Sequence, residues 1–264
     1  MMINKPVIGV AALIFVLAAT GVYYLRSRNP TLPAAPSAPT AVAPTVSEPS
    51  IAHPLPAAAG SAAAAPLPEL ADSDAPLLDA LGQISSADAV KQFLVPQDLV
   101  RKIVVTIDNL PRQKVAVDKR PANPVAGEFV ADGDELHATL DQRNFERYKP
   151  MVAVVNHLDA KQLGALYIHY YPLLQQSYQN LGYPNGYFND RLVEVIDNLL
   201  ATPEPKGPIA LVRPNVMYTY ADPALESRSA GQKLLIRMGP ENAKAIKAKL
   251  TELRAVITAG QLKH

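Results

Sequence analysis

The fold class of this 264-residue chain is decided by the segment Ala160–Leu200, AKQLGALYIHYYPLLQQSYQNLGYPNGYFNDRLVEVIDNLL. Its apolar residues recur at helical spacing on both sides of a turn-rich stretch, GYPNGY at 182–187. Asp159 is placed to cap the first helix, and Pro172 should kink or end it. The second helix is expected over 189–201, with four residues facing inward: Leu192, Val195, Ile196 and Leu199. Two helices joined by a turn therefore form the centre of the domain.

Helical periodicity continues on both sides of this centre. The clearest flanking helices are expected at 99–110 and at 243–257. Two short runs, at 208–213 and 216–220, could form a small β-hairpin. The pattern predicts a mainly α fold, a single globular helical domain over residues 70–260 with that hairpin as its β-structure.

A basic loop is expected between the helices, from Lys114 to His137, where Pro, Gly and charged residues accumulate. Four basic residues stand at or just before its start: Arg112, Lys114, Lys119 and Arg120. Long ordered loops on a helical scaffold often carry function. Arg120 is therefore a candidate for binding an anionic ligand or a partner, and a solvated loop is the alternative.

The amino-terminal run VIGVAALIFVLAATGVYYL, residues 7–25, contains no charge. As a helix it would extend roughly 28 Å, close to the ~30 Å thickness of the hydrocarbon core of a bilayer. Tyr23 and Tyr24 lie where interfacial aromatic residues are common. We expect a transmembrane helix at 7–25 after a short tail at 1–6, with the lipid bilayer as its partner. A cleaved signal peptide is the alternative.

A Pro/Ala-rich linker is expected over residues 26–69. Ten prolines and thirteen alanines fall between Pro30 and Pro68, and the segment has few large apolar residues to bury. Such a composition cannot offset the entropy of ordering the chain, which predicts a disordered linker.

The orientation in the membrane is not decided by charge, because positive charges lie on both sides of the apolar run. Lys5 precedes it, and Arg26 and Arg28 follow it. A short tail, a single anchor and a long following domain favour export of the domain. We expect a single-pass protein of the bacterial inner membrane with a periplasmic domain, and a cytoplasm-facing adaptor is the alternative.

The composition excludes several function classes. The chain has no cysteine, which excludes disulfides and thiol catalysis, and its net charge of +1 does not suggest a nucleic-acid binder. No zinc-binding histidine pair, P-loop, GxGxxG or GxSxG motif occurs. We therefore expect no metal and no cofactor, and the sequence does not favour an enzyme.

Six tyrosines fall in the central segment: Tyr167, Tyr170, Tyr171, Tyr178, Tyr183 and Tyr187. Tyrosine rings are common at protein interfaces and suit sugar rings. Tyr171, Tyr183 and Tyr187 are candidates for binding an envelope protein or peptidoglycan, whereas a role in the core is the alternative. Tyr183 and Tyr187 should be the most exposed, because they flank Pro and Gly.

Three carboxylates, Asp190, Glu194 and Asp197, share one side of the helix expected at 189–201. A pair such as Asp190 and Glu194 could act as acid and base, which makes an envelope hydrolase the alternative function. A solvated helix face gives the same pattern.

Four segments resemble an uncharacterised proteobacterial family, a domain of unknown function. They are LVRKIVVTIDNLPRQKVA (99–116), RNFERYKPMV (143–152), YPLLQQSYQNLGYPNGYFNDRLVEVIDNLLATP (171–203) and KLLIRMGPENA (233–243). The similarity covers about residues 76–258, and it implies a bacterial envelope setting without implying an activity or a ligand. The sequence as a whole predicts a membrane-tethered binding or assembly module of the bacterial cell envelope.

Overall fold

The structure, a computed structural model, describes residues 51–56, 66–115, 119–134 and 137–259. The tail at 1–6 and the expected transmembrane helix at 7–25 lie outside the described residues, as does most of the linker. Among the residues that are described, no helix is both long enough and apolar enough to cross a membrane.

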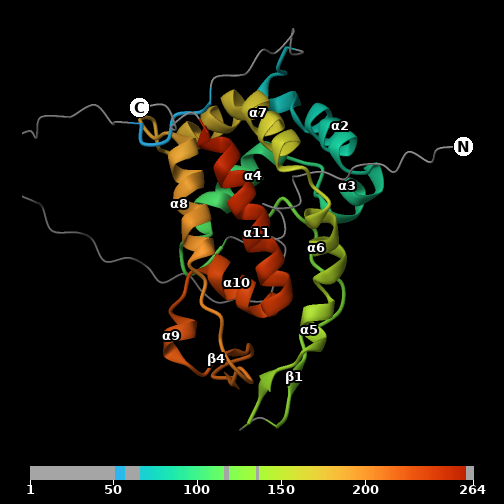
Figure 1. Cartoon of the computed structure of the whole chain (residues 1–264), viewed down its shortest axis with the longest axis vertical. Coiled ribbons are helices and arrows are strands. Elements are labelled where there is room, and N and C mark those ends of the chain that lie inside the picture. The colour runs from blue at the N-terminus through green and yellow to red at the C-terminus, as the bar shows by residue number, and fades with distance from the viewer. Residues whose placement is uncertain (1–50, 57–65, 116–118, 135–136, 260–264) are drawn as a thin grey trace, which may run out of the picture.

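The described chain is mainly helical, as predicted, and its long helices pack side by side (Figure 1). Helix α11 contacts α6, α7, α8 and α10, while α4 packs against α7 and α8. The bounds of these elements are Leu99–Asn109 for α4, Lys149–Asn156 for α6, Ala160–Asn180 for α7, Phe188–Leu200 for α8, Ala230–Met238 for α10 and Pro240–Ile257 for α11. The segment 160–200 thus supplies the helical centre that its spacing predicts.

Shorter helices complete the domain. They are the 3-10 turn η1 (Leu70–Asp72), α2 (Asp74–Ile84), α3 (Ala87–Phe93), α5 (Arg143–Glu146) and α9 (Pro223–Glu226). A side chain at the start of α2 caps the N-terminus of α4. The Asp74 carboxylate accepts the N–H groups of Asp98 at 2.8 Å and Leu99 at 2.7 Å. A side chain from one helix therefore satisfies the free amides of another.

Helix α7 runs through Pro172, where the sequence predicts a kink or an end. Asp159 caps its start by accepting the N–H groups of Lys161 and Gln162. Buried residues lie on both sides of the proline, among them Tyr171 and Leu173. Packing of both halves against α4 and α11 therefore compensates for the one hydrogen bond that proline cannot donate.

Two small antiparallel hairpins lie at the end of the molecule opposite α2 (Figure 1). The predicted hairpin is present as β3 (Leu211–Val212) and β4 (Thr219–Tyr220). A second hairpin, β1 (Ala131–Asp132) and β2 (Thr139–Leu140), was not predicted, because β1 lies within the segment 114–137, where Pro, Gly and charged residues predict a loop. The hairpins join where Leu140 N–H donates to Ile209 O and Leu211 N–H donates to Ala138 O.

The core divides into two clusters. The main cluster lies between the helices and includes Leu99, Val155, Phe188, Leu235 and Ile246, each fully or almost fully buried. A smaller cluster lies beneath the hairpins and consists of Ala138, Leu140, Leu211, Tyr220 and Ile236. The hairpin end is thus held by its own small set of apolar contacts.

Candidate functional site

Four of the six predicted site residues line one shallow hollow: Tyr183, Tyr187, Asp190 and Glu194. The hollow lies between the end of α4 and the start of α8, has a volume of about 360 Å³, and is completed by Asp108, Tyr178 and Arg191. The turn at 182–187 and the first turns of α8 bring these side chains together. The sequence offers the tyrosines and the carboxylates as separate candidates, and the structure brings two of each together.

A buried ion-pair network connects the wall of this hollow to α4. Asp108 is 5% exposed and accepts hydrogen bonds from Arg112 at 2.6 Å, from Arg191 Nε at 3.0 Å and from the Tyr183 hydroxyl at 3.3 Å. The charge of Asp108 raises the pKa of Arg112. Asp108, Arg112 and Arg191 were not predicted as site residues, although a carboxylate directly after the buried Ile107 was a usable signal.

The tyrosines divide into core and edge residues. Tyr171 is 8% exposed, and its ring lies 5.7 Å from Tyr167 and 5.6 Å from Tyr187 between centroids. Burial raises the pKa of Tyr171, and its hydroxyl donates to Gln175. Tyr171 therefore builds the core and offers no open ring face, which corrects its assignment as a binding residue.

Tyr183 and Tyr187 are the two members of the tyrosine group that are only partly buried, as expected. The ring of Tyr183 stacks on Tyr178, with centroids 4.6 Å apart. Arg120 lies elsewhere, half-buried in the loop after α4, where burial lowers its pKa. It does not line the hollow.

The carboxylates of α8 are each engaged by a different partner. Asp190 accepts the N–H groups of Ala52 and His53, whereas Glu194 pairs with Arg191 at 2.8 Å. Asp197 pairs with Arg254 at 2.6 Å. These contacts favour a structural role for Asp190 and Glu194 over an acid–base pair.

The partner of Asp190 comes from the predicted linker. Residues 51–56 lie across the start of α8, where they form the blue segment in Figure 1. Besides the two hydrogen bonds to Asp190, Leu55 N–H donates to the Tyr187 hydroxyl, and Asn189 donates to His53 O. This part of the segment 26–69 is therefore ordered on the domain, which the Pro/Ala composition did not predict.

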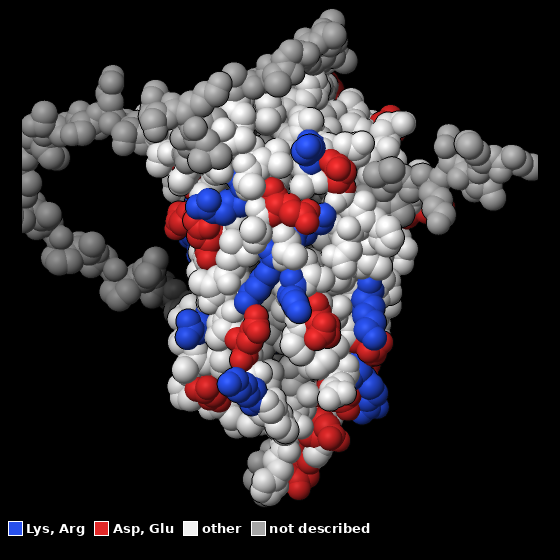
Figure 2. All heavy atoms as spheres, in the orientation of Figure 1, with Lys and Arg blue, Asp and Glu red and all other residues white. Residues whose placement is uncertain are grey.

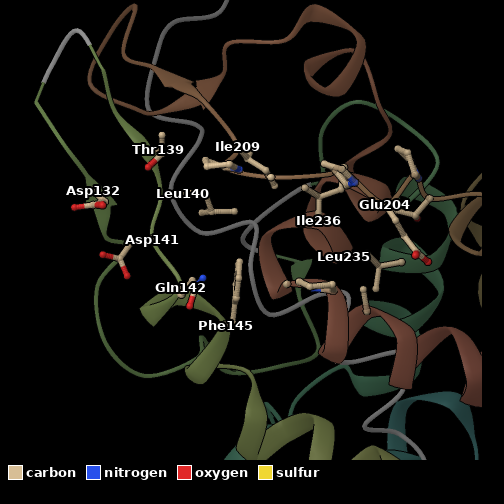
Figure 3. Close-up of a pocket in the computed structure, with 18 of the residues that line it drawn as sticks. Asp132, Thr139, Leu140, Asp141, Gln142, Phe145, Glu204, Ile209, Leu235 and Ile236 are labelled. Atoms are coloured by element: carbon tan, nitrogen blue, oxygen red, sulfur yellow. The ribbon is translucent and has the colours of Figure 1, made fainter.

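A larger cavity, of about 660 Å³, opens between the hairpins and α10. Figure 3 shows Leu140, Ile209, Phe145 and Ile236 turned toward one another around it, from β2, the strand region before β3, α5 and α10. Its other lining residues include Asp132, Asp141, Glu204, Leu235 and Lys247. We call this the hairpin cavity.

Gly239 makes the wall of the hairpin cavity possible. It links α10 to α11 with a φ of +84°, and a Cβ built on it would lie 2.4 Å from the Phe145 ring. Only glycine combines this backbone conformation with such a close ring. The cavity could not be predicted from sequence, because its walls come from three separate segments and one of its hairpins was missed.

The charged side chains on the face drawn in Figure 2 are of both signs and are interspersed. This face therefore carries no large patch of one sign to attract a polyanion.

No group of three or more His, Asp or Glu side chains that could hold a metal ion occurs within the described ranges.

Comparison with known proteins gives one family. Residues 99–254 match the model of a family described as "Protein of unknown function (DUF3014)". The match runs from α4 into α11, so it includes the hollow and the hairpin cavity and leaves residues 51–56 outside. No curated protein and no solved structure matches the chain. Since the match covers more than half of its length, the chain belongs to the DUF3014 family.

Proposed function

We propose that this chain is a membrane-tethered binding or assembly module of the bacterial cell envelope, and that it binds an apolar group of an envelope partner in the hairpin cavity. The observation that carries the proposal is the cavity itself. Its volume of about 660 Å³ lies within the range of about 300–1,000 Å³ that is usual for ligand sites. Apolar walls with a few polar groups are also typical of such sites.

The chemistry of the cavity favours a partner with an apolar anchor and positive charge beside it. Three acids line the cavity, Asp132, Asp141 and Glu204. Arg143 pairs with Asp141 and Lys247 with Glu204, so Asp132 is the acid that would face a positive charge of the partner. Lys247 is held by Thr202 O at 2.7 Å and by Glu204 at 3.3 Å. A segment of an envelope protein with such a composition fits better than uncharged glycan, so peptidoglycan is the second candidate.

A crosslinking experiment in cells tests the site. A photoreactive residue at position 209 should give a discrete adduct with an envelope protein, because Ile209 lines the cavity. The matched position is Val216, which is 70% exposed in the same hairpin region and does not line the cavity. Equal adducts from both positions, or none from position 209, would contradict the proposal.

Membrane tethering is supported by the uncharged run at 7–25 and is tested by topology reporters. Alkaline phosphatase fused after the domain should be active, and a fluorescent protein that matures only in the cytoplasm should stay dark. The opposite pair of results would place the domain in the cytoplasm and favour the adaptor.

A further inference from the structure

Residues 51–56 are held on the domain by hydrogen bonds to their main chain. The Asp190 carboxylate accepts Ala52 N–H at 3.0 Å and His53 N–H at 2.6 Å. The side-chain amide of Asn189 donates to His53 O at 2.8 Å, and the Tyr187 hydroxyl accepts Leu55 N–H at 3.2 Å. Four main-chain groups of one short segment are thus bound by three neighbouring side chains.

The bound pattern matches the sequence of the segment. Pro54 has no N–H, and it falls between His53 and Leu55, whose N–H groups are both bound. Leu55 also packs against the edge of the main core, whereas Ile51 is 52% exposed. The surface therefore binds the N–H groups of two consecutive residues and makes no hydrogen bond that a proline at the third position would lose. At the fourth position it binds another N–H group and contacts an apolar side chain.

The domain itself positions two of the binding side chains, Asn189 and Tyr187, and stabilises the charge of the third, Asp190. Asn189 is fully buried, and its Oδ1 accepts the Tyr167 hydroxyl at 2.9 Å. The Tyr187 ring lies against Tyr171, with 5.6 Å between centroids. Asp190 lies in the first turn of α8, where the helix dipole stabilises a negative charge. A site whose side chains are already oriented binds with a smaller entropic cost.

We propose that Tyr187, Asn189 and Asp190 form a peptide-binding site, the tether clamp, that recognises the main chain of an extended, proline-containing segment, with the chain's own residues 51–56 as its resident ligand. The clamp is separate from the hairpin cavity, so either proposal can fail alone. An attached segment has a high effective concentration, so it should exclude free peptides.

The first test removes the donors without touching the domain. In the full chain in detergent, Ala52→Pro with His53→Pro deletes both N–H groups that Asp190 accepts. Hydrogen exchange at the Leu55 amide should accelerate at least about tenfold, since hydrogen bonds to a charged group are among the stronger ones. Ile51→Pro is the matched control, because it adds a proline and keeps both donors. Unchanged exchange at Leu55 in the double variant would overturn the clamp.

The second test measures binding in trans. A labelled peptide with the sequence of residues 50–57, SIAHPLPA, should bind saturably to the chain carrying Ala52→Pro and His53→Pro. Adding Asp190→Ala should weaken this binding at least about tenfold, whereas Glu194→Ala on the same helix should not. The unaltered chain should bind the peptide more weakly than the double variant.

Two outcomes would refute the proposed site. One is no saturable binding of the peptide to the double variant, which would mean that residues 51–56 merely pack where they are attached. The other is an equal effect of Asp190→Ala and Glu194→Ala, which would place the peptide elsewhere. Circular dichroism of each variant checks that α8 is intact.

Discussion

Asp108 joins α4 to α8 through a carboxylate that is almost completely buried. Replacing it with alanine leaves Arg191, whose side chain is 16% exposed, without its Asp108 carboxylate partner. Arg191 keeps its pair with Glu194, so its charge still has a partner, and we expect the lost buried hydrogen bonds to lower the free energy of unfolding, measured in urea, by about 1–3 kcal/mol. Asp197→Ala breaks a half-exposed pair with Arg254 and should cost less than about 1 kcal/mol. Similar losses for the two variants would contradict a special role for Asp108.

Buried tyrosines make the fold sensitive to high pH. Burial raises the pKa of Tyr167 and of Tyr171 above the ordinary value near 10. At higher pH the unfolded chain loses protons that the folded chain keeps, so the folded state binds more protons. The contribution of these tyrosines to the free energy of unfolding should therefore be largest below pH ~10 and should decrease as the pH rises further.

The variant Tyr167→Phe isolates this effect. Its free energy of unfolding should decline less steeply above pH ~10 than that of the unaltered chain, because one buried hydroxyl no longer titrates. Chemical denaturation at a series of pH values measures both slopes. Parallel slopes would show that Tyr167 does not couple folding to pH.

The gathering of Tyr183, Tyr187, Asp190 and Glu194 could be predicted because all four belong to one turn and the helix that follows it. Local spacing fixes such neighbours. Asp108 and Arg191 are 83 residues apart, and no local pattern reports that contact. The same limit explains why the burial of Tyr171 could not be predicted. Helical spacing cannot distinguish a buried ring from an exposed one when neighbouring elements cover more than one face of the helix.

Gly164 of α7 lies directly against Val256 of α11. A Cβ there would lie 2.2 Å from Cγ1 of Val256, a β-branched side chain with little freedom to move. Gly164→Ala should lower the free energy of unfolding, because overpacking costs typically 1–3 kcal/mol against about 1 kcal/mol gained in helix propensity. Adding Val256→Ala should relieve the clash.

A double-mutant cycle measures this relief. We expect a favourable coupling of at least about 1 kcal/mol between the two alanines in urea denaturation. Additive losses would mean that the helices shift apart instead. A cycle with Gly164→Ala and the exposed Thr251→Ala, also on α11, is the control.

The predicted helices were right where one apolar face repeats along a long segment, as in α4, α7 and α8. The local effect of Pro172 predicts a kink or an end, and the packing of α7 against α4 and α11 outweighs that effect. The β1–β2 hairpin has two residues in each strand, and it is held by backbone hydrogen bonds to the strand region before β3. Its formation depends on contacts that are distant in sequence.

The two core clusters predict uneven stability across the molecule. The cluster beneath the hairpins consists of five buried residues, far fewer than the main cluster contains. Amide protons in the hairpins should exchange through local opening, while those in the middle of α7 and α11 should require global unfolding. Hydrogen exchange measured against low denaturant concentrations distinguishes the two. Equal opening free energies would indicate one cooperative unit.

The helical spacing of apolar residues predicted the mainly helical domain, whereas the position of residues 51–56 depends on a surface that exists only after folding. A Pro/Ala-rich segment has little to bury on its own. Asp190, Asn189 and Tyr187 supply partners for its main chain, so order arises from the domain rather than from the segment. The composition describes what the segment can bury by itself, whereas residues 51–56 are ordered by contacts that the folded domain supplies.

The contacts of residues 51–56 also have a mechanical consequence. A pulling force on the N-terminal side of the chain reaches Asp190 and Tyr187 before it reaches Leu70, where the domain begins. While these hydrogen bonds hold, the chain between them and the domain is spared tension. Their rupture would release up to about 45 Å of contour length, at roughly 3.3–3.6 Å per residue over 57–69. The segment is thus a breakable link that carries the first load into the start of α8, and its rupture lets the chain extend before the load reaches Leu70.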